Sequence, residues 1–348
     1  MAEVDWFRYP LVRGSDCGRR WLQIQTDLGL AKNTVEAYAR GLDGYLRFLR
    51  DLEMDPTECN REVIASFIRS LMVKPGATRG KVISIRAKAV LSNATLQQRL
   101  TAVRLFYDFL VEEQLCEKNP VGRGRYTPGK AFGSMSQRGL VQRYDTLPWI
   151  PTEEEWRSIL AVVQTKPTRV RLMFALGYDA ALRREELCSI ETADIDPAHR
   201  MVRIRAEVTK NRLERVVPYS IHTNFLYQEY LGERRHVGTG RGRLFLSSSR
   251  RNHGKPLSFW MWSKTVREIA IESGVSRLTP HTLRHLRLTD LARAGWDVHE
   301  IATFAGHRSI QTTLGYIHLS GHELAEKLER TLAEVDVERL RILHGEPR

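Results

Sequence analysis

A stretch rich in glycine, arginine and serine, residues 119–145, divides this chain of 348 residues into two parts. It contains two X-Pro steps, Asn119-Pro120 and Thr127-Pro128. Such a composition is typical of a linker. Since an average domain has about 150 residues, each flanking part is long enough to bury a core of its own. The sequence therefore predicts two domains joined by a basic linker, residues 119–145.

The part before the linker carries apolar residues at helical spacing. One stripe runs from Val35 to Leu49, a second from Val63 to Leu71, and a third from Leu96 to Val111. Apolar residues three or four positions apart line one face of a helix. We therefore predict an all-helical domain over residues 17–118, preceded by an irregular arm over residues 1–16.

The part after the linker mixes helical and strand patterns. Thr152 is followed three residues later by Glu155, which predicts a capped helix start. Residues 201–205 and 215–217 alternate or are β-branched, as in a short β-hairpin. We predict a mainly α protein whose second domain, residues 146–320, is mixed α/β, mostly helical with a small antiparallel sheet. An amphipathic pattern over the last residues, 321–348, predicts a C-terminal helical tail.

The net charge of +13 favours a polyanionic partner, with nucleic acid ahead of a membrane surface. No apolar run approaches the roughly 20 residues that a membrane helix needs. From Val63 to Tyr107 there are eight basic residues and no acidic one, and the linker repeats this bias. From these two stretches we predict DNA-binding residues, namely Arg79, Lys81, Arg86, Lys88, Arg123 and Arg125.

The cysteines lie far apart and form no CxxC pair, which argues against a disulfide framework or a cysteine zinc site. This usage fits a reducing compartment. The first residues, 1–21, carry charges throughout and predict no signal peptide. We therefore expect a cytoplasmic protein whose four cysteines, Cys17, Cys59, Cys116 and Cys188, are free thiols.

Residues that can handle a phosphate or a proton gather between Pro280 and Tyr316. His281 and Arg284 are three apart and project from one side of a helix. The arginine fork suits two-pronged contact with a phosphate, and histidine can accept a proton near neutral pH. Each residue type here also has a plain structural interpretation, such as an ion pair, a helix cap or a packing tyrosine. Arg183 or its neighbour Arg184 could clamp a phosphate from another element, although an exposed helix start is the simpler interpretation of both.

The order of these motifs resembles the tyrosine recombinase family, which includes phage integrases and the Xer-type and Cre-type recombinases. The motifs are Arg-x-x-Glu-Leu, a lysine before Glu-Arg-Val-Val-Pro, His-x-Leu-Arg-His, and Gly-His followed nine residues later by Tyr. The resemblance covers residues 150–320 well and residues 17–115 more loosely. It implies catalytic roles for six residues, Arg183, Lys210, His281, Arg284, His307 and Tyr316. Ala180-Ala181 stands where the family commonly has Thr-Gly, and Arg184 replaces an apolar residue.

The resemblance implies a site-specific recombinase that cuts and rejoins DNA strands without metal, ATP or another cofactor. Tyr316 would attack the scissile phosphate and form a 3′-phosphotyrosine link, while Lys210 would protonate the leaving 5′-oxygen. His281 would assist as a base. Members of the family act as tetramers on two duplexes, in some cases with accessory proteins, so a homotetramer on double-stranded DNA is expected.

Three other functions remain open at this stage. His281 and His285 have the spacing of zinc ligands, and with His307 they could serve a metal-dependent phosphoesterase, although no HExxH motif is present. The fold could also serve a DNA-binding regulator without catalysis. The same chemistry could relax DNA, as in a type IB topoisomerase, or form hairpin telomeres.

Overall fold

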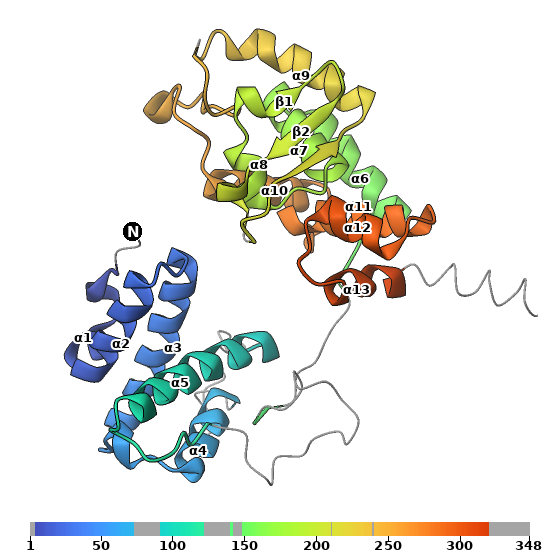
Figure 1. Ribbon diagram of the computed structural model, residues 1–348. Helices are drawn as coiled ribbons and strands as arrows, with labels where there is room; N and C mark the ends of the chain where they lie inside the picture. Colours follow the sequence, from blue (N-terminus) through green and yellow to red (C-terminus); the bar gives the residue numbers. More distant parts are fainter. Residues whose placement is uncertain are drawn as a thin grey trace, which may run out of the picture. The chain divides into compact units, whose positions relative to one another are not determined.

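The computed structural model describes residues 4–72, 91–121, 140–141, 148–209, 211–238 and 240–319. The chain divides into two compact units, Met1–Asp145 and Thr146–Arg348. Each unit has a hydrophobic core of its own. The predicted mainly helical fold with one small antiparallel sheet is confirmed (Figure 1). Most of the predicted linker and all of the predicted tail, residues 321–348, lie outside the described residues.

The N-terminal unit is helical throughout its described part. Its longest helices, α3 and α5, pack closely because position 41 is a glycine. A Cβ at Gly41 would lie 2.9 Å from the Cβ of Ala102 on α5. The elements are η1 (Trp6–Arg8), α1 (Pro10–Gly14), α2 (Asp16–Asp27), α3 (Lys32–Asp51), η2 (Pro56–Glu58), α4 (Arg61–Met72) and α5 (Asn93–Glu112).

The prediction of an irregular arm over residues 1–16 is wrong, because η1, α1 and the first residue of α2 lie there. Val12 is fully buried and Tyr9 nearly so. The carboxylate of Asp43 on α3 accepts backbone N–H bonds from Leu11 at 2.9 Å and from Val12 at 3.4 Å. A helix of five residues is too short to show an apolar period, and the carboxylate that binds its backbone is distant in the sequence.

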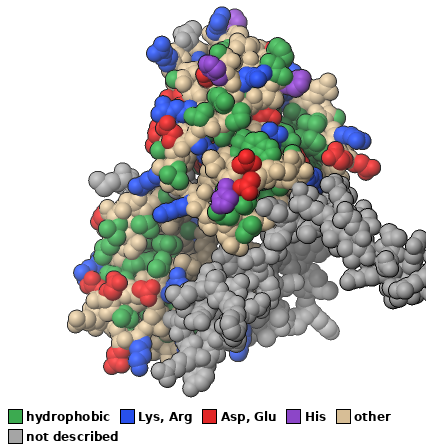
Figure 2. Space-filling view, turned by 45° about the vertical axis from the view of Figure 1, so that its right-hand side comes forward, with side chains coloured by type: hydrophobic (Ala, Val, Ile, Leu, Met, Phe, Trp, Pro, Cys, Tyr) green, Lys and Arg blue, Asp and Glu red, His purple; other side chains and the backbone are tan. Residues whose placement is uncertain are grey.

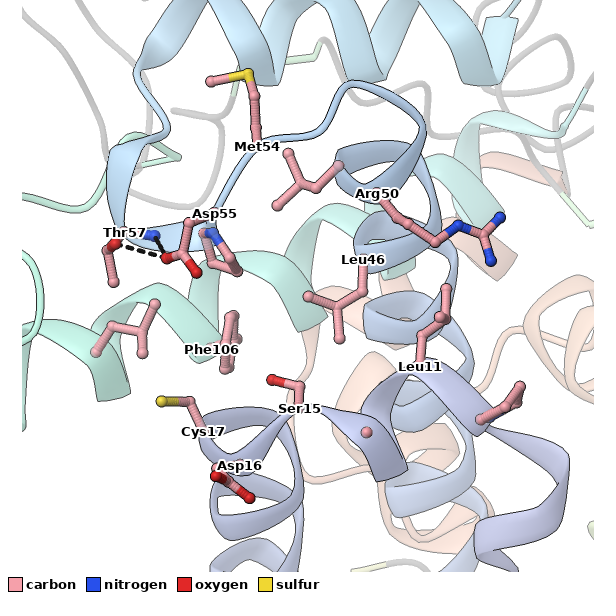
Figure 3. Close-up of a pocket in the computed structure, with 15 residues that line it drawn as sticks. Leu11, Ser15, Asp16, Cys17, Leu46, Arg50, Met54, Asp55, Thr57 and Phe106 are labelled. Atoms are coloured by element: carbon pink, nitrogen blue, oxygen red, sulfur yellow. Dashed lines mark hydrogen bonds between the residues drawn. The ribbon is translucent and has the colours of Figure 1, made fainter.

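A cavity of about 460 Å³ opens in the N-terminal unit (Figure 3). Its walls come from α1, α2, α3 and α5 and from the turn at η2. In that turn the side chain of Asp55 accepts hydrogen bonds from the backbone and hydroxyl of Thr57, at 2.8 and 2.6 Å. None of the residues that we predict to be catalytic lines this cavity.

The C-terminal unit combines helices with a three-stranded antiparallel sheet. Its helices are α6 (Glu153–Gln164), α7 (Thr168–Asp179), α8 (Arg184–Ser189), α9 (Ile221–Arg234), α10 (Phe259–Glu272), α11 (Pro280–Arg293), α12 (Val298–Ala305) and α13 (Gln311–Leu319), with 3-10 turns η4 (Thr192–Asp194), η5 (Ala206–Val208) and η6 (Arg250–Asn252). The predicted capping box is present, since Thr152 and Glu155 bond reciprocally at the start of α6. Among the described residues, no helix combines the length and the apolarity that a membrane crossing requires.

The sheet has the order β1 (Ile195–Asp196), β2 (Met201–Ile204), β3 (Arg215–Pro218). The predicted pair of strands is present, with Met201 opposite Pro218 and Ile204 opposite Arg215. The short strand β1 was not expected, because two residues show no alternation. Residues along β2 alternate between solvent and core, with Val202 and Ile204 inside. This register carries Arg215, at the start of β3, toward the candidate site.

Candidate active site

Local sequence signals determine where the site helices begin and end. Pro280 is the first residue of α11, and Thr279 before it forms a capping box with Thr282. Asp297 forms a capping box with Glu300 at the start of α12. Gly306 ends α12 in the left-handed conformation, with φ at +62°. Helices α11, α12 and α13 pack against one another, so the two ends of the motif-rich segment meet (Figure 1).

Arg284 is the most buried charge of the site, with 3% of its surface exposed. Its guanidinium donates at 2.6 Å to the backbone carbonyls of Ala181 and Ala305. Burial, together with the charge of Arg183, lowers the pKa of Arg284 to about 9, so the group stays charged at neutral pH. Ala181 has a φ of +47°, a strained value for alanine. That backbone conformation presents the carbonyl that fixes Arg284.

Arg183, and not Arg184, faces the site. It precedes α8 and donates to Glu186 at 2.7 Å and to the carbonyl of Gly306 at 3.3 Å. Arg184 turns elsewhere, pairing with Glu185 and lying over the ring of Phe259. The open choice between the two arginines is therefore decided by their contacts.

Glu186 joins the two arginines that flank the site. Its carboxylate, 1% exposed, pairs with Arg183 at 2.7 Å and with Arg215 at 2.7 and 3.1 Å. Burial raises the pKa of this carboxyl, but the hydrogen bonds and charges of Arg215 and Arg183 outweigh burial and lower it to about 2. With Arg284 nearby, three guanidinium groups face one carboxylate. The resulting positive charge suits an anion such as a phosphate.

The ring of His307 is neutral and its tautomer follows from its partners. Its Nε2 lies 2.9 Å from Nη2 of Arg284, and its Nδ1 lies 2.9 Å from the hydroxyl of Thr313. Since a guanidinium only donates, Nε2 accepts and Nδ1 carries the proton to Thr313. Burial, and then the charges of Arg284 and Arg183, lower the pKa of His307 to about 3.

The Tyr316 side chain is packed into the core of the C-terminal unit, with 5% of its surface exposed. The charges of Arg284 and Arg183 act on its hydroxyl, although burial dominates and raises its pKa. The ring stacks on His307, with centroids 6.0 Å apart and planes 11° apart. Its oxygen lies 2.9 Å from Nδ1 of His285. The hydroxyl is thus protonated at neutral pH and close to the positive cluster of the same chain.

Four of the six residues that we predict to be catalytic, Arg183, Arg284, His307 and Tyr316, are brought together in this way. His281 is exposed on the first turn of α11, with its ring 6.3 Å from that of His285. Desolvation by neighbouring atoms lowers its pKa, while Glu185 opposes this shift. Lys210 lies outside the described residues, as do Arg79, Lys81, Arg86, Lys88, Arg123 and Arg125.

Among the described residues, no group of three or more histidine, cysteine, aspartate or glutamate side chains is arranged to hold a metal ion. Both ring nitrogens of His307 and one of His285 already have protein partners. The zinc-ligand interpretation of these histidines therefore has no support in their geometry.

Two family models match the chain. The phage integrase family matches residues 151–323, and the phage integrase N-terminal SAM-like domain matches residues 20–114. The chain belongs to the phage integrase family. It is thus a tyrosine recombinase, a site-specific enzyme that cuts and rejoins DNA. The family resemblance that the sequence motifs indicated is confirmed.

Relatives of known name align over most of their length. The tyrosine recombinase XerD of Oceanobacillus iheyensis is 27% identical over 312 residues, which cover 87% of this chain and 93% of that protein. Transposase A of transposon Tn554 from Staphylococcus aureus is 27% identical over 337 residues, 90% of each chain. Both alignments span the helical domain as well as the catalytic domain.

Solved structures share the fold. XerH recombinase bound to a palindromic difH substrate, in a post-cleavage complex, aligns with a TM-score of 0.63 and 19% identity over 85% of this chain and 79% of that one. A lambda integrase dimer bound to a COC′ core site aligns with a TM-score of 0.62 and 17% identity, over 86% of this chain and 94% of that one.

In this recombinase, four residues near the site had no assigned role from the sequence. Glu186 and Arg215 had been noted only as parts of motifs, and His285 only for its spacing from His281. Thr313 carried no signal, although it is fully buried beside His307. The i, i+4 histidine pair could have identified His285 as a site residue, since both rings lie on one face of α11.

On the face shown in Figure 2, basic, acidic and apolar side chains are interspersed over the described residues. Lysine and arginine do not form one continuous patch on this face.

Proposed function

We propose that Tyr316 is the nucleophile of this recombinase. It attacks the scissile phosphate, forms a 3′-phosphotyrosine link and frees a 5′-hydroxyl. One observation carries the assignment: the charges of Arg183 and Arg284, drawn from distant parts of the same chain, act on the hydroxyl, and the tyrosine ring stacks on the histidine that is bonded to Arg284. A phenol in such surroundings has a positive site next to it in which a phosphate can bind.

Arg183 and Arg284 bind the non-bridging oxygens of that phosphate and stabilise the charge that develops on them. Each guanidinium has five N–H groups, and its bonds to the protein use only part of them. His307 supports Arg284 in the free enzyme. A bound phosphate anion raises the basicity of His307, which can then donate to a phosphate oxygen. His281, exposed on the same helix as Arg284, contacts the phosphate or assists as a base.

Lys210 is the acid that protonates the leaving 5′-oxygen. This role rests on its position before the Glu214-Arg215-Val216-Val217-Pro218 motif. Asn211 donates to the carbonyl of Gly306 at 3.2 Å, and the same carbonyl accepts from Arg183. Those contacts support a role at this site for the lysine that precedes Asn211.

Strand joining reverses the first step, with a 5′-hydroxyl from a second duplex attacking the phosphotyrosine. The link retains the energy of the broken phosphodiester, so the reaction requires neither ATP nor a metal. The proposal extends to a cytoplasmic homotetramer on two duplexes, assisted in some reactions by accessory proteins. Residues 17–118 bind the DNA core site, the basic linker 119–145 follows its backbone, and the segment 321–343 either docks on a neighbouring protomer or packs on its own domain.

The test uses a duplex that carries a nick close to the cleavage site, so that the short strand diffuses away and the covalent complex accumulates. Wild type should form the protein–DNA adduct, also in excess EDTA. Tyr316→Phe should bind the duplex and form no adduct. Tyr38→Phe, a partly buried tyrosine in the N-terminal unit, is the control and should react as wild type does. An adduct with Tyr316→Phe at the wild-type rate would exclude Tyr316 as the nucleophile.

A further inference from the structure

The hydroxyl of Tyr316 is bonded to a histidine outside the six residues assigned above. Its oxygen lies 2.9 Å from Nδ1 of His285, and the two rings lie 5.7 Å apart at 31°. His285 follows Arg284 directly and lies one turn after His281. The side chain of His281 is exposed, whereas that of His285 is partly buried. The contact to the hydroxyl thus comes from the more buried histidine of the pair.

The direction of this hydrogen bond follows from the neighbours of the hydroxyl. The positive charge of Arg284 acts on the Tyr316 hydroxyl, which favours an O–H whose proton points away from the guanidinium. In that orientation the hydroxyl donates its proton to Nδ1 of His285. The neutral ring of His285 then carries its proton on Nε2.

The ring of Tyr316 is held between two imidazoles. His307 stacks on it with nearly parallel planes, and the ring of His285 approaches at a larger angle. His307 itself is fixed by Arg284 and by Thr313, which lies one turn before Tyr316 on α13. Stacking determines the plane of the tyrosine ring, whereas a hydrogen bond is needed to determine where the O–H points.

We propose that His285 is a positioning residue for strand cleavage, which accepts the hydrogen bond of Tyr316 in the free enzyme and aims its oxygen at the phosphate site. The inference rests on the proposed role of Tyr316 as nucleophile. His285 is not the final proton acceptor. Burial, and then the charges of His281 and Arg284, lower its pKa to about 4, while the pKa of Tyr316 is raised. A ring of such low basicity suits an acceptor of a hydrogen bond and not a base for a phenol.

If His285 only positions the hydroxyl, its loss should affect strand cleavage and strand rejoining differently. Before cleavage, the direction of the hydroxyl depends on His285. After cleavage, the oxygen is esterified, so the covalent bond fixes its place and no O–H remains to be held. Loss of His285 should therefore slow cleavage and leave rejoining unchanged. A proton acceptor would act in both directions, because the departing phenol must regain its proton.

The experiment compares His285→Ala with His285→Asn, whose side-chain oxygen can accept a hydrogen bond near the place of Nδ1 but cannot take a proton. Cleavage of the nicked duplex should be about 100-fold slower in the alanine variant, the order expected for a misplaced nucleophile. The asparagine variant should cleave at close to the wild-type rate. Once loaded with DNA, all three proteins should rejoin an added 5′-hydroxyl strand equally fast.

Thermal melting and duplex binding, measured for each variant, separate misfolding from loss of position. The proposal is overturned if a folded, DNA-binding alanine variant cleaves as fast as wild type. It is also overturned if the asparagine variant is as slow as the alanine variant, or if rejoining slows as much as cleavage. If Tyr316→Phe still forms the adduct, the assignment of Tyr316 as nucleophile is wrong. That result differs from each of the His285 results above, so the two proposals can fail separately.

Discussion

At the scale of single residues, Glu186 determines where two arginines lie. It is almost fully buried and pairs with both Arg183 and Arg215. Replacing it with alanine leaves two guanidinium groups without their counter-charge, which should lower the free energy of unfolding by about 3–5 kcal/mol. The neighbouring Glu185, half exposed and paired with Arg184, is the control, and Glu185→Ala should cost about 1 kcal/mol or less. Urea denaturation measures both, and equal losses would contradict the prediction.

The same carboxylate should make stability depend on pH in the acidic range. Its folded pKa is about 2, below the ordinary 4.5, so the unfolded chain binds the proton more tightly. The stabilisation is therefore complete above about pH 5 and is lost as pH falls toward 2, with a total of about 3 kcal/mol. Unfolding curves at several pH values should show Glu186→Gln and wild type converging as the pH falls. A gap that stays constant from neutral to acidic pH would refute this.

At the scale of elements, the residue that ends α12, Gly306, contacts two arginines of the proposed phosphate site. Gly306 has a φ of +62°, and a Cβ there would lie 2.9 Å from Nη1 of Arg215. The carbonyl of Gly306 accepts a hydrogen bond from Arg183. Gly306→Ala should thus combine left-handed strain of about 1–2 kcal/mol with displacement of Arg215, and should lose most cleavage activity.

Gly295 provides a matched control for this helix end. Its φ is +82°, and a Cβ there would meet no heavy atom within 4 Å. Gly295→Ala should therefore carry the backbone strain alone, lowering the melting temperature while strand cleavage is retained. If the two variants lose cleavage activity equally, the contact between position 306 and Arg215 has no role in the site.

At the scale of the whole molecule, the net charge of +13 predicts a strong dependence of DNA affinity on salt. If the basic stretch binds phosphates, glutamine at positions 79, 81, 86 and 88 together should lower the slope of log K against log salt. The decrease should reach up to about 0.9 for each phosphate that the variant no longer neutralises. Arg19 and Arg203, each beside an acidic partner, are the control, and their glutamine variants should change the slope less. Filter binding over a salt series gives both slopes, and an unchanged slope in the fourfold variant would place the phosphate-binding residues elsewhere.

The sequence by itself determined the helical N-terminal domain, the antiparallel strand pair and the ordered motifs of the recombinase family. These depend on short-range regularities, such as apolar period, capping residues and the spacing of motifs along one helix. The helix that carries Arg284 could be predicted in this way, whereas the roles expected for Arg284 and Tyr316 came from the family resemblance. The brief helix at residues 10–14 could not, because its order depends on Asp43, about 30 positions away.

Only the tertiary structure decided which groups meet. Arg183 was separated from Arg184 by its contacts with Glu186 and Gly306, which lie on different elements. His285 became a partner of Tyr316 because α13 packs against α11, and Thr313 became a partner of His307 for the same reason. Hydrogen bonds between residues distant in sequence depend on where whole helices pack, and no local pattern of residue types contains that information.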